Sequence, residues 1–230
     1  MKIRDELQGA ITDKKIRALL IKLHTAASRQ ERGSKIKPMF RPRRGKTLPL
    51  DQIDHSRDNK YMALDPAQGV FCYFLAKAIR ARRIIEFGTS FGVSTIYLAM
   101  AIRDNRGGQV IGIELIEEKA TRARENLNKA GLLEFVDIRV GNALETLKDI
   151  EGPVDFFLND GFPRYALPVL KMVVPHMRTG SVIVTDNVGL FKADYREYVE
   201  YLRNPNNGFQ SVLMGLNEGT EFSIKVAGTV

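Results

Sequence analysis

Cysteine is almost absent from this chain of 230 residues, in which Cys72 stands alone. A single cysteine excludes an internal disulfide and a cysteine-based metal cluster within one chain. Long apolar runs are missing too, because no stretch approaches the roughly 18 residues that a membrane span needs. The charged start MKIRDELQGA carries no signal-peptide core. We therefore expect a soluble, cytoplasmic protein, long enough to bury one large core.

Acidic residues are too few to balance the basic ones, and 35 lysines and arginines against 27 aspartates and glutamates leave a formal net charge of +8. The excess gathers between residues 29 and 46, where Glu31 is the only acid and Phe40 the only aromatic residue. Such a segment either holds phosphates of a nucleic acid or another polyanion, or forms a solvated lid. The lid is favoured, because no nucleic-acid-binding motif accompanies the charges. The basic residues are Arg29, Arg32, Lys35, Lys37, Arg41, Arg43, Arg44 and Lys46.

No repeat or low-complexity tract interrupts the chain, and strand and helix patterns alternate from residue 66 onward. We predict helical spacing over 3–28, an irregular basic stretch to about 60, and a helix over 66–81 that Asp65 and Pro66 begin. Predicted strands lie at 83–87, 109–114, 135–140, 154–159 and 181–185. Predicted helices between them lie at 93–103, 117–130, 143–148 and 164–177, and the segments GFQSVLMGL and TEFSIKVAG predict a C-terminal hairpin.

The alternation predicts an α/β fold: a Rossmann-like, doubly wound, seven-stranded and mostly parallel sheet with an antiparallel C-terminal hairpin and an N-terminal helical extension. We divide the chain into an N-terminal appendage or lid, 1–60, and a core domain, 61–230. The apolar face of residues 3–23 either forms a dimer interface or packs on its own domain.

The segment IIEFGTSFGVST, residues 84–95, predicts a buried strand, a glycine-rich turn and a helix start. Gly88 and Gly92 let a ligand approach the backbone, and Ser94 falls where free N–H groups attract an anion. A dinucleotide fingerprint requires G-x-G-x-x-G, but position 90 holds serine and an acid, Glu86, precedes the first glycine. This spacing favours S-adenosylmethionine (SAM) over NAD. Glu114 ends the next strand, where a carboxylate accepts hydrogen bonds from ribose hydroxyls.

A second polar group follows the later strands. Asp160 ends the strand in FFLNDG, and Asp186 and Asn187 end the strand in SVIVTDN. Because the carboxyl ends of parallel strands meet at one sheet edge, we expect these side chains to converge. Oxygen ligands suit a hard cation such as Mg²⁺, although aspartates at strand ends also cap helices and bind loop N–H groups.

Six motifs over residues 60–230 together carry a resemblance to a known family. They are MALDPAQG (62–69), EFGTSFGVS (86–94), GIEL (112–115), GNALETL (141–147), DFFLNDG (155–161) and VIVTDN (182–187). The chain resembles class I SAM-dependent O-methyltransferases of the catechol and caffeoyl-coenzyme A type, particularly their bacterial relatives. The resemblance implies cofactor contacts from Met62, Leu64, Glu86, Gly88, Thr89, Ser90, Ser94, Glu114, Leu115, Asn142, Ala143 and Asp160, and metal ligation by Asp160, Asp186 and Asn187.

The chain departs from the family at two positions. Catechol enzymes place a basic lysine three residues after the first metal aspartate, and Pro163 stands there, which cannot transfer a proton. The base is therefore unassigned, with Lys192 as a weak candidate if a nearby cation lowers the pKa of its amine. Asn142 replaces the usual aspartate beside adenine, and its amide can still bond to the base.

Three functional hypotheses follow, and the sequence does not identify the methyl acceptor. The favoured one is a SAM-dependent O-methyltransferase that acts on a small catechol-like or phenol-like acceptor with a divalent metal, as a homodimer. The second is a SAM-dependent enzyme acting on RNA or another polyanion, which the basic segment 29–46 motivates. The third is a non-catalytic SAM-binding or dimerisation module, which Pro163 motivates. A dinucleotide oxidoreductase is a distant fourth.

Overall fold

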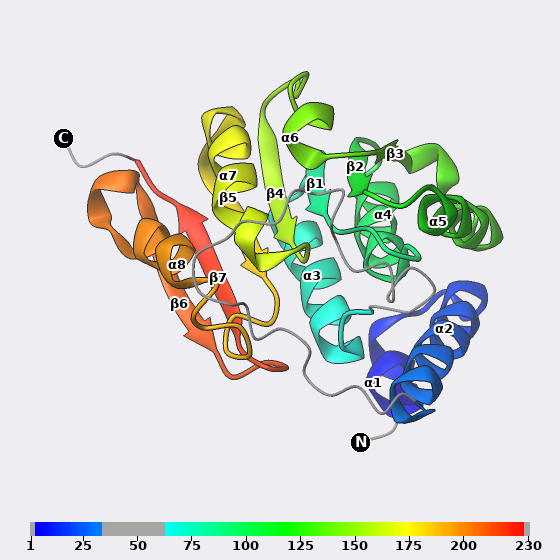
Figure 1. Ribbon diagram of the computed structural model, residues 1–230. Coiled ribbons are helices and arrows are strands. Elements are labelled where there is room, and N and C mark those ends of the chain that lie inside the picture. Colours follow the sequence, from blue (N-terminus) through cyan, green and yellow to red (C-terminus); the bar gives the residue numbers. More distant parts are fainter. Residues whose placement is uncertain (1–2, 34–62, 228–230) are drawn as a thin grey trace.

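Seven strands form one central sheet with helices on both faces (Figure 1). The computed structural model describes residues 3–33 and 63–227. The strands are β1 (Arg83–Phe87), β2 (Gln109–Glu114), β3 (Val136–Val140), β4 (Val154–Asn159), β5 (Met177–Thr185), β6 (Phe209–Met214) and β7 (Thr220–Lys225). The helices are α1 (Ile3–Ala10), α2 (Lys14–Gly33), α3 (Pro66–Ala78), α4 (Val93–Asp104), α5 (Glu117–Ala130), α6 (Ala143–Thr146), α7 (Pro163–Val173) and α8 (Arg196–Arg203).

The strand order is β3-β2-β1-β4-β5-β7-β6, and only the β5–β7 and β6–β7 pairings are antiparallel. The predicted doubly wound, mostly parallel sheet with an antiparallel C-terminal hairpin is confirmed. The order reverses between β1 and β4, so the turns that follow these two strands diverge to opposite faces. Ligands of open parallel sheets bind at such a switch point, beyond the carboxyl ends of the strands.

The predicted strand positions agree with the structure within one residue for the first four strands, whereas β5 begins earlier, at Met177. The predicted start of α3 is confirmed, since Asp65 accepts a hydrogen bond from the Ala67 N–H at 2.9 Å. The helical spacing over 3–28 divides into two helices, because Asp13 caps a new helix through the Ile16 N–H. The sequence analysis missed α8 altogether.

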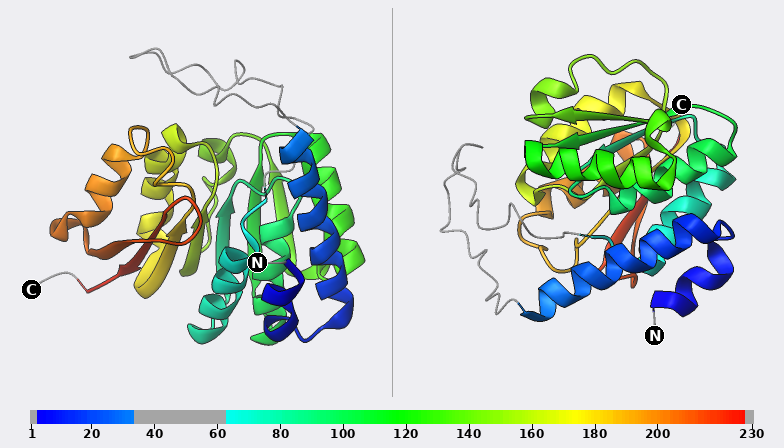
Figure 2. Two further views of the ribbon diagram at one scale, coloured as in Figure 1. Left: turned by 90° about the horizontal axis from the view of Figure 1, so that it is seen from below. Right: turned by 90° about the vertical axis from the view of Figure 1, so that its right-hand side faces the viewer.

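Two hydrophobic cores lie on opposite faces of the sheet. Helices α3, α4 and α5 cover one face and α6, α7 and α8 the other (Figure 1). The first two helices lie against the α3–α5 side (Figure 2), and their apolar residues Leu7, Ile16 and Leu20, all fully buried, belong to the same core as the sheet residues. The apolar face of residues 3–23 thus packs on its own domain. The proposed boundary at residue 60 lies outside the described residues.

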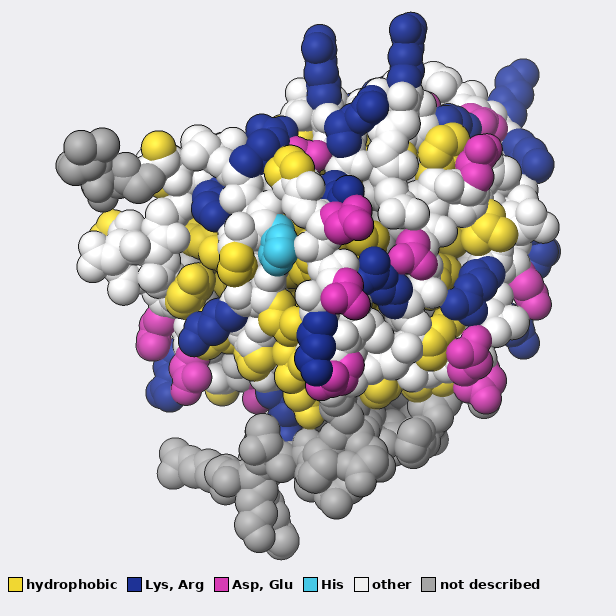
Figure 3. Space-filling model, turned by 90° about the horizontal axis from the view of Figure 1, so that it is seen from above, with side chains coloured by type: hydrophobic (Ala, Val, Ile, Leu, Met, Phe, Trp, Pro, Cys, Tyr) yellow, Lys and Arg dark blue, Asp and Glu magenta, His cyan; other side chains and the backbone are white. Residues whose placement is uncertain are grey.

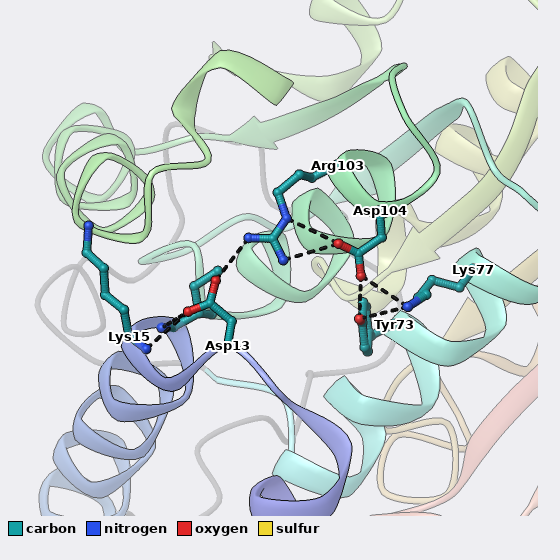
Figure 4. Close-up of polar contacts among 7 residues, drawn as sticks. Asp13, Lys15, Tyr73, Lys77, Arg103 and Asp104 are labelled. Carbon is teal, nitrogen blue, oxygen red and sulfur yellow. Dashed lines mark hydrogen bonds and ion pairs between the residues drawn. The ribbon is translucent and has the colours of Figure 1, made fainter.

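A polar network ties the α1–α2 turn to the domain (Figure 4). Arg103, on α4, donates to Asp13 Oδ2 at 3.1 Å and also pairs with Asp104. Asp104 in turn accepts hydrogen bonds from Tyr73 and Lys77 of α3. The N-terminal helices are therefore held by ionic contacts as well as by apolar packing. No helix in the described ranges is long and apolar enough to cross a membrane.

Candidate active site at the carboxyl edge of the sheet

The turn from β1 to α4 is shaped by glycine and fixed by the neighbouring strand. Gly88 has a φ of +98°, and a Cβ there would lie 2.5 Å from the backbone oxygen of Asp160. The N–H groups of Gly88 and Thr89 both donate to the carbonyl of Ile113, at the end of β2. A larger residue at position 88 would therefore separate the β1 turn from the β4 turn. The packing of these two turns thus requires glycine at position 88, and the approach of a ligand to Gly88 stays a prediction.

Glu86 lies at the centre of this turn with no exposed surface. Its Oε2 accepts hydrogen bonds from Thr89 at 3.0 Å and from Thr95 at 2.6 Å. Its Oε1 has no hydrogen-bond partner among the described residues. Burial raises the pKa of Glu86, and the hydroxyls of Ser94, Thr95 and Thr89 oppose this shift. An unpaired buried carboxylate oxygen is costly, so it marks a place for a donor or a positive charge.

Glu114 connects the end of β2 to the β1 turn. Its Oε2 accepts from the Ser90 N–H at 2.7 Å, and its Oε1 accepts from the Ile116 N–H at 3.0 Å. Burial raises its pKa, while these backbone contacts and the charge of Lys119 oppose the shift. Each carboxylate oxygen has a further lone pair, so the group is positioned and still able to accept bonds from two hydroxyls. The hydroxyl of Ser90 is buried and unpartnered in the described part of the chain.

Of the remaining predicted cofactor residues, Leu115 follows β2 and Asn142 and Ala143 follow β3 at this edge. Asn142 caps α6 by accepting from the Leu144 N–H at 3.0 Å, so its side-chain oxygen is engaged. Ala143 and Leu64 are buried, at 5% and 2% exposure, and Leu115 is half-buried. Met62 lies outside the described residues.

Asp160 and Asp186 come together at the ends of β4 and β5. Their carboxyl groups lie close enough together for each to shift the pKa of the other. Burial raises the pKa of Asp160 well above its usual range, and the carboxylates of Asp186 and Glu86 raise it further. Burial also raises the pKa of Asp186. Two buried carboxyls in contact repel each other once both are ionised, and a cation between them would relieve that repulsion.

Asn187 completes the predicted donor set at the end of β5. It has a φ of +56°, and its amide donates to Asp186 Oδ2. In the described part of the chain no group of three or more His, Cys, Asp or Glu side chains could hold a metal ion. The set here has two carboxylates and one carboxamide. These are oxygen ligands of the kind that hard divalent cations bind, so the residues fit such an ion.

Two residues that the sequence analysis did not single out hold Asp186 in place. Gln68, fully buried on α3, donates through Nε2 to Asp186 Oδ1 at 2.9 Å and to Thr220 Oγ1 at 3.0 Å. Asn217 also donates to Asp186 Oδ1, at 3.1 Å. A polar side chain within the apolar run of α3 was the available signal for Gln68. The contacts of Asn217, in the β6–β7 loop, and of Thr220, the first residue of β7, could not be read from local sequence.

Neither Pro163, which stands where the family has its basic lysine, nor the candidate base Lys192 is shown in contact with the site among the described residues. Pro163 is the first residue of α7, where its missing N–H costs nothing. Lys192 is exposed, in the turns that follow Asn187. The structure therefore assigns no base, and the role of Lys192 stays a prediction.

The known proteins that this chain resembles in sequence and in structure are methyltransferases. A family described as a methyltransferase domain matches residues 85–188. The chain is similar to a catechol O-methyltransferase of Mycobacterium tuberculosis, with 38% identity over 128 residues that cover 55% of this chain and 57% of that protein. It is also similar to caffeoyl-CoA O-methyltransferase 1 of Eucalyptus globulus, with 27% identity over 67% of each chain.

Among solved structures, it resembles the O-methyltransferase TomG of Streptomyces achromogenes in complex with SAM. The TM-score is 0.66, with 26% identity, covering 75% of this chain and 86% of that one. The chain spans little more than half of the length of the catechol relative that it matches. The family resemblance predicted from the six motifs is confirmed.

Proposed function

Because residues 85–188 match a family described as a methyltransferase domain, we propose that this chain transfers a methyl group from SAM to a hydroxyl oxygen of a small catechol-like or phenol-like acceptor. The names of the catechol and caffeoyl-CoA O-methyltransferases support the acceptor class, and the structure of TomG in complex with SAM supports the donor. The observation that carries the proposal is the pair of positioned, buried carboxylates at the switch point. Glu86 keeps one oxygen unpaired, and Glu114 keeps lone pairs free.

The residues of the β1 turn would bind the cofactor from one end to the other. Glu86 Oε1, buried without a partner, would pair with the amino group at the methionine end. Glu114 would accept from the ribose hydroxyls, and Asn142 and Ala143 would border the adenine. When bound, SAM supplies a methyl group on a positively charged sulfur, which is already a strong electrophile. The protein therefore contributes mainly by orienting the two reactants.

Asp160, Asp186 and Asn187 would hold a divalent cation such as Mg²⁺. When bound, the cation would lower the pKa of an acceptor hydroxyl and supply positive charge beside its oxygen. Gln68 and Asn217 would keep Asp186 oriented, because both donate to its Oδ1. Lys192 is the only residue proposed as the base. Positioning of the acceptor oxygen against the methyl group accounts for much of the rate of methyl transfer.

Calorimetric titration with S-adenosylhomocysteine tests the cofactor assignment. Glu114→Gln should weaken binding at least about tenfold, because it removes charge-assisted hydrogen bonds. Glu117→Gln, which alters an exposed glutamate at the start of α5, should leave binding unchanged. No binding by the unaltered chain would refute the proposal. Equal loss in both variants would refute the role of Glu114.

Adding catechol with and without Mg²⁺ tests the acceptor and the metal. We expect methylated catechol, detected by mass spectrometry, only with Mg²⁺, and loss of this product in Asp160→Asn. Product formed equally without a divalent cation would contradict the metal ligands. Methylation of RNA and not of catechol would favour the second hypothesis. A cytoplasmic location and a homodimer belong to this proposal as predictions.

A further inference from the structure

A pocket of about 480 Å³ opens at the amino ends of the parallel strands, the edge opposite to the Gly88 turn. Arg83 and Gln109 begin β1 and β2, and Arg178 lies near the start of β5. The lining, here called the arginine pocket, consists of Arg80, Arg82, Arg83, Gly108, Gln109, Pro153, Asp155 and Arg178. Four guanidinium groups therefore gather around one concave surface with a single carboxylate.

That carboxylate is fully engaged in holding the pocket together. Asp155, only 4% exposed, accepts at Oδ2 from the backbone N–H groups of Arg82 and Arg83, at 2.7 and 3.0 Å. Its Oδ1 accepts from Arg178 Nε at 2.8 Å. One negative charge thus positions three arginines and neutralises at most one of them. The pocket keeps a positive surplus on a framework that the sheet makes rigid.

The other cations have weak partners or none. Among the described residues, the guanidinium of Arg82 donates only to the carbonyls of Asn105 and Arg106, at 3.1 and 3.3 Å. The carboxylate that pairs with Arg83 belongs to Glu151, at 4.0 Å, and the side chain of Glu151 is 88% exposed. Arg80 is exposed, with no hydrogen bond or ion pair from its side chain among the described residues. On the face in Figure 3, basic side chains lie both beside acidic ones and apart from them.

We propose that the arginine pocket binds a small ligand that carries a phosphate or diphosphate group. Guanidinium groups bind phosphate oxygens through paired N–H donors, and several on one concave surface suit a group with more than one negative charge. The volume is that of a small-molecule site, whereas a nucleic acid needs an extended surface. The site faces away from the SAM-binding edge, so it does not depend on the proposed function.

Calorimetric titration of the full chain with inorganic pyrophosphate, at low and high NaCl, tests this assignment. The double variant Arg80→Gln, Arg83→Gln should raise the dissociation constant at least about tenfold, because it removes two cations with no strong internal partner. Arg122→Gln, which alters an exposed residue of α5 outside the pocket, should leave it unchanged. Thermal melting should show that the double variant remains folded. Titration with ADP then distinguishes a nucleotide from free diphosphate as the source of the group.

Two results with variants would overturn the proposal. One is equal weakening in the double variant and in Arg122→Gln, since it would mean attraction by net charge alone. The other is loss of binding when Arg41, Arg43 and Arg44 are changed to glutamine with the pocket intact, since it would locate the anion on the basic segment. Saturating S-adenosylhomocysteine should not compete with pyrophosphate, because the two sites lie at opposite sheet edges. Competition would locate the anion at the cofactor edge instead.

Discussion

At the residue scale, Gln68 joins α3 to the end of β5 through its contact with Asp186. Gln68→Met keeps the size of the side chain and removes its hydrogen-bond donors. Because partners of metal ligands orient those ligands, we expect Mg²⁺ binding to weaken at least about tenfold. The affinity for S-adenosylhomocysteine should change little. Calorimetry with each ligand measures both effects.

The matched control for this prediction is Gln109→Met, which changes an exposed glutamine at the other edge of the sheet. It should leave Mg²⁺ binding unchanged. If Gln68→Met binds Mg²⁺ as the unaltered chain does, then Gln68 has only a packing role.

His24 makes folding stability depend on pH. The ring lies buried on α2 and hydrogen-bonds with the Tyr97 hydroxyl at 2.9 Å, and burial lowers its pKa from 6.5 to about 4. As the pH falls, His24 is therefore protonated near pH 6.5 in the unfolded chain but only near pH 4 in the folded chain. The free energy of unfolding contributed by this group should fall by roughly 3 kcal/mol across that interval and stay constant above it.

Urea denaturation at pH 7.5, 6, 5 and 4 measures this dependence in the unaltered chain and in His24→Gln. The buried carboxyls of the site have raised pKa values and act in the opposite direction, so the difference between the two proteins isolates His24. If that difference does not change with pH, His24 is not the buried titrating group described here.

At the scale of the elements, apolar packing and polar contacts contribute unequally to the docking of α2. Leu20 is fully buried in the core, so Leu20→Ala should lower the free energy of unfolding by about 2–5 kcal/mol. Asp13 is partly exposed, and Asp13→Ala removes a helix cap and one ion pair (Figure 4), which should cost about 1–2 kcal/mol. Chemical denaturation of both variants measures the two values. A larger loss for Asp13→Ala would show that the ionic network holds the helix.

Prediction of helices and strands succeeded where apolar residues follow a regular pattern on one face or both faces of the element. β4 is buried along its whole length, as a parallel strand covered by helices on both faces must be, and VDFFLN is apolar apart from Asp155 and Asn159. α8 was missed although Tyr195, Tyr198 and Leu202, which are buried, have helical spacing. Its exposed residues are mostly charged, and the short segment follows a run of turns, so the apolar signal was weak.

At the scale of the whole molecule, the first two helices complete the core on the α3–α5 side of the sheet. Deletion of residues 1–33 should expose the apolar surface that they cover. The truncated protein should therefore melt at a lower temperature and aggregate even without heating. Size-exclusion chromatography and thermal melting of the truncated chain test this. A monodisperse truncated protein that melts like the full chain would show that these helices are a dispensable appendage.

The sequence by itself determined the alternation of elements, the glycine-rich turn, the carboxylates at strand ends and the family resemblance. These depend on local backbone preference and on residue spacing, which a single chain displays directly. Only the tertiary structure decided how closely Asp160 and Asp186 approach, that Gln68 and Asn217 hold Asp186, and that Arg178 joins Arg80, Arg82 and Arg83 around one pocket. Those contacts join residues more than twenty positions apart, and they arise because the strand order β3-β2-β1-β4-β5-β7-β6 brings particular strand ends together. The order of the strands in the sheet cannot be predicted from the residues of any one segment.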